Sequence, residues 1–140
     1  MQVKVHVLSS TILAFTFYYF TRSLAGAITL LFTGILLDLD HLFDFWKSRP
    51  HNPCNIGEFL HPKNYMRRNS KVLVLLHSYE IAILLGLITW QFHWQAVPFA
   101  LSCAFTLHLI LDDIGNNLKT FSYFLIYRAF KKFHVFPEAE

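Results

Sequence analysis

Four long apolar stretches divide this chain of 140 residues, with short polar turns or one longer polar segment between them. The stretches run over residues 6–21, 23–46, 72–91 and 95–114. A helix rises about 1.5 Å per residue and a bilayer core is about 30 Å thick, so about 20 apolar residues can span it. None of the stretches alternates with the period of a transmembrane barrel strand. The pattern predicts an all-α, integral membrane four-helix bundle; a very apolar soluble helical bundle is the alternative.

Beyond residue 117 the pattern changes, because aromatic and aliphatic residues recur about once per helical turn, with basic residues on the other faces. The apolar positions are Leu118, Phe121, Phe124, Tyr127, Phe130 and Phe133. This spacing predicts a C-terminal interfacial amphipathic helix over residues 118–134. A helix whose apolar stripe packs against the bundle is an equally good interpretation.

The segment between the second and third stretches, residues 47–71, contains Pro50, Pro53 and Pro62. We expect an irregular loop there, with at most one short helical turn near residues 56–60. With no repeat and no low-complexity tract, the whole chain, residues 1–140, is predicted to form a single membrane domain.

The composition narrows the function classes. Hydrophobic residues make up 54% of the chain and charged residues only 15%, against about a quarter charged in an average soluble domain. The net charge is +3 and the basic residues form no stripe, which excludes a nucleic-acid partner. Cys54 and Cys103 lie in very different surroundings, a polar loop and an apolar run, so no disulfide is predicted.

The distribution of Lys and Arg predicts an orientation. Basic residues precede the first stretch, crowd the segment 47–71 and follow the fourth stretch, whereas only Arg22 falls on the opposite side. Because positive residues in short loops stay cytoplasmic, we expect a multi-pass protein of the inner (plasma) membrane with both termini in the cytoplasm. Membrane lipid is then its expected partner.

Acidic and imidazole side chains occur where apolar helices should exclude them. Six of the nine acids lie in or at the inner ends of the apolar stretches, together with four histidines: Asp38, Asp40, Asp44, Glu80, Asp112, Asp113, His6, His41, His77 and His108. A charge at depth costs about 2.5–3.5 kcal/mol, so such residues tend to face inward and pair with one another or with ions. In all four stretches, an acidic or imidazole residue lies about 20–24 Å along the helix from the outer turn. The four stretches therefore bring these residues to a similar depth.

The local spacing of these side chains favours a metal site. His108 and Asp112 are four apart and Asp38 and His41 three apart, so each pair shares a helix face. Helical bundles hold zinc, iron and manganese with such inward ligands. The predicted ligands are His6, Asp38, Asp40, His41, His77, His108 and Asp112. They would bind one or preferably two divalent ions, with zinc first and manganese or iron as alternatives; a purely structural polar network is the competing interpretation.

Two of these acids cannot both act as ligands on a regular helix. Asp38 and Asp40 are two residues apart and share no helix face unless the helix unwinds there. One of them could instead orient a ligand imidazole. Asp44 is expected either to be a ligand or to pair with Lys47.

Glu80 and Asp113 are the predicted catalytic residues. Glu80 lies one helical turn after His77 and could act as general base, or it could be protonated and hydrogen-bonded to a neighbouring helix. Asp113 could fill the same role or cap the end of its helix near Gly115 and Asn116.

The order of these motifs resembles the inner-membrane, metal-dependent hydrolases of the YdjM type. The matching elements are an early His6, the run Asp38-Leu39-Asp40-His41, the run Leu76-His77-Ser78, and His108 followed by Asp112. The resemblance implies a small helical membrane protein with a hydrolytic metal site. Val72, Leu73 and Val74 stand where that family usually has His, Arg and Gly, so one ligand and one anion-binding Arg are absent.

We therefore expect a hydrolase with a site facing the cytoplasm, in which a metal-bound hydroxide attacks a phosphoester or a lipid-like ester. A metal-ion or proton transporter is the first alternative, because His and Asp within spans also make ion pathways. A non-catalytic metal-binding membrane protein is the second. Clustering of the polar residues at one end favours a pocket over a conduction path.

Overall fold

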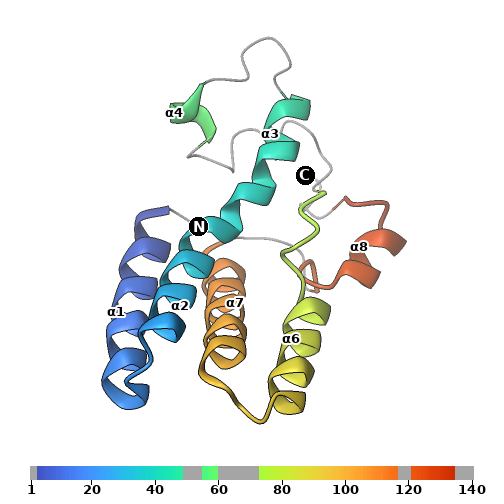
Figure 1. Ribbon diagram of the computed structural model, residues 1–140. Helices are drawn as coiled ribbons and strands as arrows, with labels where there is room; N and C mark the ends of the chain where they lie inside the picture. The colour runs from blue at the N-terminus through green and yellow to red at the C-terminus, as the bar shows by residue number, and fades with distance from the viewer. Residues whose placement is uncertain (1–2, 49–54, 60–72, 117–120, 135–140) are drawn as a thin grey trace.

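The computed structural model describes residues 3–48, 55–59, 73–116 and 121–134, and all regular elements within these ranges are helices (Figure 1). In chain order they are α1 Val3–Thr21, α2 Leu24–Leu36, the 3₁₀ helix η1 Leu37–Asp40, α3 His41–Ser48, α4 Ile56–Phe59, α6 Tyr79–Gln91, α7 Ala96–Gly115 and α8 Leu125–Phe130. The prediction of an all-α fold is confirmed for the part of the chain described here.

Two helical hairpins build the body of the molecule. Short turns join α1 to α2 and α6 to α7, and both turns lie at the same end in Figure 1. Ser23 caps α2, because its Oγ accepts the amide of Gly26 at 3.1 Å. His93 and Trp94 take left-handed φ angles of 51° and 58°, which let the chain reverse within the second turn. Helix α2 packs against α1 and α7, and α6 packs against α7.

The contact of α1 with α2 and α7 depends on small residues. A core cluster joins Ala14 and Phe17 of α1, Leu30 of α2, and Ala100 and Ala104 of α7. Further along, the α1–α2 contact is so close that a Cβ on Gly34 would lie 2.0 Å from Ser10 Oγ. Small residues at crossings let helix backbones approach, as is typical of membrane bundles.

The second apolar stretch is not one regular helix. Between α2 and α3 the backbone tightens into η1, over Leu37–Asp40. A 3₁₀ helix has three residues per turn, so it brings Asp38 and His41 to the same side of the chain. Asp40, two residues after Asp38, stays on a different side of the chain.

The third helix, predicted over residues 72–91, begins later than the sequence indicated. Residue 72 lies outside the described residues, Leu73–Ser78 are not helical, and α6 starts only at Tyr79. The cause is competition for backbone groups, since side chains from distant elements bind the amides and carbonyls of this segment. Ser78 then caps α6, with its Oγ accepting the amide of Ile81 at 3.4 Å.

The predicted helix over residues 118–134 is much shorter in the structure. Residues 118–120 lie outside the described part, and Phe121 begins a turn with a φ of 65°. Helix α8 covers only Leu125–Phe130, and Lys132 again has a positive φ, of 50°. Helix α8 begins where the Glu80 carboxylate accepts backbone amides, so a tertiary contact sets its start.

Of the predicted irregular segment 47–71, the structure describes the end of α3 and the short helix α4, which agrees with the turn expected near 56–60. The remainder, residues 49–54 and 60–71, lies outside the described residues.

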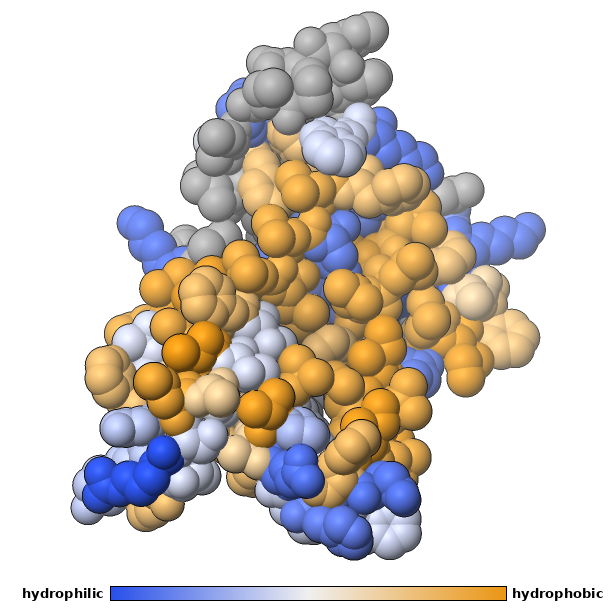
Figure 2. Space-filling view, in the orientation of Figure 1, coloured by the Kyte–Doolittle hydropathy of each residue, from blue (hydrophilic) through white to orange (hydrophobic). Residues whose placement is uncertain are grey.

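The outside of the helical hairpins is apolar, and Figure 2 shows hydrophobic side chains over much of the face. Within the described ranges two continuous helical stretches, Leu24–Ser48 and Ala96–Gly115, are long and apolar enough to cross a membrane, each with a mean hydropathy of 1.5. Only 28% and 33% of them are buried inside the molecule. Helix α6 is also apolar but shorter.

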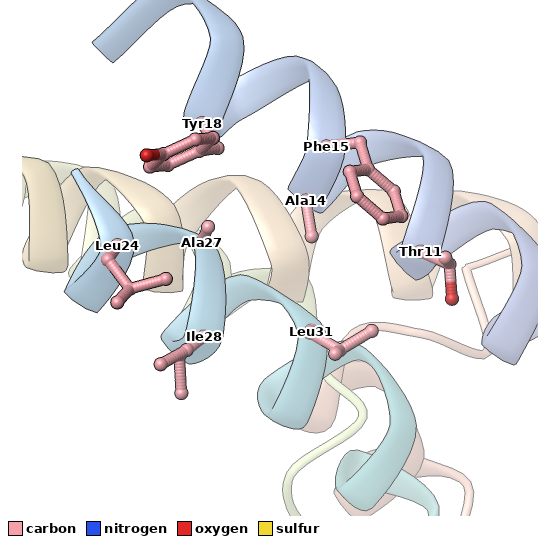
Figure 3. A pocket seen from close by; sticks show the side chains of 8 residues that line it. All are labelled: Thr11, Ala14, Phe15, Tyr18, Leu24, Ala27, Ile28 and Leu31. Atoms are coloured by element: carbon pink, nitrogen blue, oxygen red, sulfur yellow. The ribbon is translucent and has the colours of Figure 1, made fainter. Parts of the chain in front are cut away.

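An apolar groove of about 380 Å³ lies between α1 and α2 (Figure 3). It is lined by Thr11, Ala14, Phe15, Tyr18, Leu24, Ala27, Ile28 and Leu31. The Thr11 hydroxyl donates to the carbonyl of Val7 at 2.7 Å, so its hydrogen-bonding demand is met within α1.

Candidate metal centre

Six of the seven predicted ligands meet in one buried cluster, at the end of the hairpins opposite their turns. They come from α1, η1, α3, the segment before α6, and α7: His6, Asp38, His41, His77, His108 and Asp112. The four histidines and Asp112 are each 7% exposed or less. The structure thus brings these six side chains together.

The first half of the cluster contains His6 and His108 with two carboxylates. His6 Nε2 lies 3.1 Å from Asp112 Oδ1, and His108 Nε2 lies 3.2 Å from Asp38 Oδ1. One ligand atom from each of the four residues lies within 4.8 Å of all the others. This is the compactness that a single metal ion requires of its donors.

The second half uses the same two carboxylates with His41 and His77. His77 Nε2 lies 3.5 Å from Asp38 Oδ1 and 3.4 Å from Asp112 Oδ2, and His41 Nε2 lies 3.6 Å from Asp38 Oδ1. These four residues also offer donor atoms within 4.8 Å of one another. Asp38 and Asp112 are therefore shared by the two groups, each of which adds its own pair of imidazoles.

The outer nitrogens of two imidazoles are fixed by hydrogen bonds. His108 Nδ1 donates to the carbonyl oxygen of Gly34 at 2.9 Å. His77 Nδ1 lies 3.1 Å from both carboxylate oxygens of Asp40. Because a carbonyl and an ionised carboxylate only accept, each neutral ring carries its proton on Nδ1 and presents a lone pair at Nε2.

These two lone pairs face each other, since His77 Nε2 and His108 Nε2 are 3.2 Å apart. Two acceptor nitrogens at that distance repel unless a cation, either a proton or a metal ion, lies between or beside them. Within the described residues, the buried Nδ1 atoms of His6 and His41 have no hydrogen-bond partner. The donor set thus fits a divalent ion, and these buried groups could hold one.

Asp40, a predicted ligand, belongs to neither group of donors. Its Oδ2 accepts the amide of Leu76 at 3.1 Å, and its carboxylate faces His77 Nδ1. It holds the backbone beside His77 and the imidazole itself. Asp40 is thus placed as the orienting carboxylate that the sequence left as an alternative for one of the two acids.

The structure does not bring the predicted catalytic acids to the cluster. Glu80 Oε2 and Oε1 accept the amides of Leu125 and Ile126 at 2.9 and 3.0 Å, so its carboxylate caps α8. Asp113 is exposed, and its Oδ2 accepts the Tyr79 hydroxyl at 3.0 Å. Neither belongs to a donor group, since Glu80 faces the C-terminal segment and Asp113 faces Tyr79.

Two further buried charges support the cluster from outside. Asp44 is 1% exposed, and its Oδ2 accepts the amide of Leu73 at 2.9 Å. It belongs to neither donor group, and Lys47, its expected partner, lies close enough to act on its charge. Arg128 is 2% exposed and donates to backbone carbonyls. Sequence reasoning missed Arg128, since an arginine in an aromatic-rich basic segment carries no pattern that distinguishes it from an interfacial residue.

Comparison of the chain with known protein families, with curated proteins and with solved structures found no match.

Proposed function

We propose that this chain is a membrane-embedded, metal-dependent hydrolase with a two-ion site. The observation that carries the proposal is the pair of imidazole nitrogens, His77 Nε2 and His108 Nε2, 3.2 Å apart and close to the carboxylates of Asp38 and Asp112. Such an arrangement is favourable when divalent cations neutralise it, and unfavourable when nothing does. Nitrogen and oxygen donors in these numbers suit zinc first, then manganese or iron.

Charge and donor number favour two ions over one. Asp38 and Asp112 belong to both donor groups, and each group adds a different pair of histidines. Together with Asp40 they place three carboxylates in a largely buried space, and such like charges disfavour one another strongly unless cations compensate them. One divalent ion would leave this set with a net charge of −1; two would bring it to +1, which a hydroxide or an anionic substrate would balance.

When bound, such ions would activate water and stabilise the oxygens of a hydrolytic transition state. The protein contributes the fixed frame: His108 is held by the carbonyl of Gly34 and His77 by Asp40. Asp38 is the most exposed side chain of the set, at 17%, against 8% or less for its partner imidazoles. A substrate would therefore approach from the side of Asp38.

A bilayer location is the second part of the proposal. The helical stretches that pass the length and hydropathy criteria expose most of their surface, whereas the core helix of a soluble protein is mostly buried. Large apolar side chains, among them Phe15, Phe32 and Ile83, are exposed on α1, α2 and α6. Patches of this kind mark contact with membrane or partner. We propose four spans, with the cluster and both termini on the cytoplasmic side.

A lipid-like ester is the substrate class that suits this location. A cluster near one end of the spans would lie at the depth of headgroup ester bonds, and the groove of Figure 3 offers an apolar surface to an acyl chain. A phosphoester of a membrane lipid and an acyl ester are both compatible with two-ion hydrolysis.

Transport of an ion is the alternative that the arrangement favours less. A conduction path needs polar groups through the whole membrane. Between the cluster and the hairpin turns, residues 9–21, 24–36, 81–91 and 96–106 contain no His, Asp, Glu, Lys or Arg. The site is consequently one-sided.

The test is hydrolysis by the full chain purified in detergent and loaded with Zn²⁺ or Mn²⁺. We expect turnover of a phospholipid or phosphomonoester panel that a chelator abolishes and added metal restores. His108→Ala should lose this activity and His93→Ala, at the opposite end, should keep it. Metal-loaded protein that hydrolyses nothing, yet carries metal into liposomes, would establish the transporter instead.

A further inference from the structure

The backbone that presents His77 has no helical hydrogen bonds of its own to hold it. Leu73–Ser78 form an irregular segment directly before α6. Its polar groups must therefore find partners elsewhere, because buried amides and carbonyls are costly when unpaired. Those partners decide where the His77 imidazole lies.

On one side, acids of the second stretch bind the amides of this segment. Asp44 accepts from Leu73 and Asp40 from Leu76. On the other side, Arg128 binds its carbonyls: Nη1 donates to Val74, and Nη2 donates to His77 at 2.9 Å. The segment is thus gripped between carboxylates and one guanidinium.

The C-terminal segment makes two more contacts with the same region. The amide of Tyr79 donates to the carbonyl of Tyr123 at 2.9 Å, and the Glu80 carboxylate caps α8. We call residues 121–130 the C-terminal clasp. Its contacts follow one another along the chain from Val74 to Glu80, and they enclose His77.

Burial of the Arg128 guanidinium costs desolvation free energy, so its contacts have to offset that cost. Its guanidinium forms no ion pair with any carboxylate among the described residues, and burial lowers the pKa of Arg128. Asp40, Glu80 and Asp44 act on this charge from a distance, and its buried Nε has no hydrogen-bond partner in the described part of the chain. The two bonds to carbonyls therefore have to offset much of the cost of burial. The planar fork of Arg reaches two carbonyls at once, which a lysine ammonium on a flexible stem does not reproduce.

We infer that Arg128 is a positioning residue for the metal centre, which fixes His77 by holding the carbonyls of Val74 and His77. The inference rests on the proposed function and adds that the C-terminal clasp sets the affinity of the site. Outer partners of metal ligands typically change metal affinity by about 10–100-fold. A residue that touches no ligand side chain would then control binding through the backbone.

Binding of Zn²⁺ alone to the full chain in detergent tests this inference, with Arg128→Lys as the main variant and Lys132→Gln as the exposed control. We expect Arg128→Lys to raise the Kd for zinc by about 10–100-fold and to alter the visible spectrum of the Co²⁺-loaded protein. Lys132→Gln should change neither. A purely structural role would lower the melting temperature of the metal-free protein without moving the cobalt bands.

Glu80→Gln is the second variant, to be used if Arg128→Lys does not fold. It weakens the contact of the Glu80 carboxylate with the amides of Leu125 and Ile126 in the C-terminal clasp. It should give a smaller loss of zinc affinity. Variants that fold and bind zinc like the unaltered chain would overturn the inference. An unaltered chain that binds no zinc would instead defeat the proposed function, so the two failures are distinguishable.

Discussion

Individual side chains of the cluster divide into those that face inward and those that hold them. The imidazole Nε2 atoms and the carboxylates of Asp38 and Asp112 point at one another, whereas Asp40 and the carbonyl of Gly34 bind the far side of two rings. This division is typical of metal sites, in which partners of the ligands fix ring orientation and tautomer. Asp40 and Asp112, which the sequence does not distinguish, therefore have different roles in metal binding.

Asp112→Asn and Asp40→Asn should therefore differ sharply. Asp112 belongs to both donor groups, so its amide variant should lose stoichiometric metal. Asp40→Asn keeps all six inward donors and should only weaken binding, by about 10–100-fold. Isothermal titration with Zn²⁺ measures both.

Asp113→Asn is the matched control. Asp113 is the exposed neighbour of Asp112, and its carboxylate accepts a hydrogen bond from Tyr79 and lies outside both donor groups. The variant should bind zinc normally. Equal losses in the variants of Asp40 and Asp112, or a loss in that of Asp113, would contradict the assignment.

At this scale the sequence predicted which side chains converge but not what each one does. Spacing along a regular helix left Asp38 and Asp40 equivalent, and only η1 separates them. The general-base hypothesis for Glu80 assumed that the third helix continues through His77. Because the helix begins at Tyr79, Glu80 lies in its first turn and faces α8.

At the scale of elements, the α1–α2 contact positions half of the cluster. Gly34 lies against Ser10 of α1, and its carbonyl accepts from His108 of α7. Three helices therefore meet at one residue without a side chain. A larger residue there would separate α1, which carries His6, from the other ligands.

Gly34→Ala should destabilise the protein by about 1–3 kcal/mol through overpacking, because the added Cβ would lie 2.0 Å from Ser10 Oγ. The control is Gly86→Ala in α6, where nothing lies within 4 Å of the new Cβ. Removing a glycine from that helix interior should stabilise it by about 0.5–1 kcal/mol. Thermal unfolding in detergent, followed by circular dichroism, compares them; a Gly34 variant as stable as the unaltered chain would exclude this packing.

Hydrophobic patterning predicted α1 and α7 well because each is a long apolar run bounded by a turn, but within residues 23–46 it did not predict the change from α2 to η1 and α3. It failed at Leu73–Ser78 because the partners of that backbone lie far away in sequence: Asp44 is 29 residues before Leu73, and Arg128 is 51 after His77. The same holds for α8, whose start is set by Glu80, 45 residues before Leu125. Local pattern contains no information on such contacts.

For the whole molecule, the proposed topology puts the hairpin turns and α3 on opposite sides of a membrane. Figure 1 shows the turns at one end and α3 at the other. Basic residues gather on the side of α3, so that side should be cytoplasmic.

Single cysteines introduced into a chain with Cys54 and Cys103 replaced by serine test this orientation. Gln95→Cys, in the exposed turn between α6 and α7, should react with a membrane-impermeant maleimide in intact cells. Lys47→Cys, exposed at the end of α3, should react only after permeabilisation. Labelling of both positions in intact cells, or of neither after permeabilisation, would refute the proposed topology.

The metal content of the purified full chain tests the central claim most directly. Elemental analysis of protein prepared in detergent with limiting zinc should find about two ions per chain, and a double variant His77→Ala, His108→Ala should contain almost none. A chain without bound metal, or one whose metal survives both substitutions, would contradict the account.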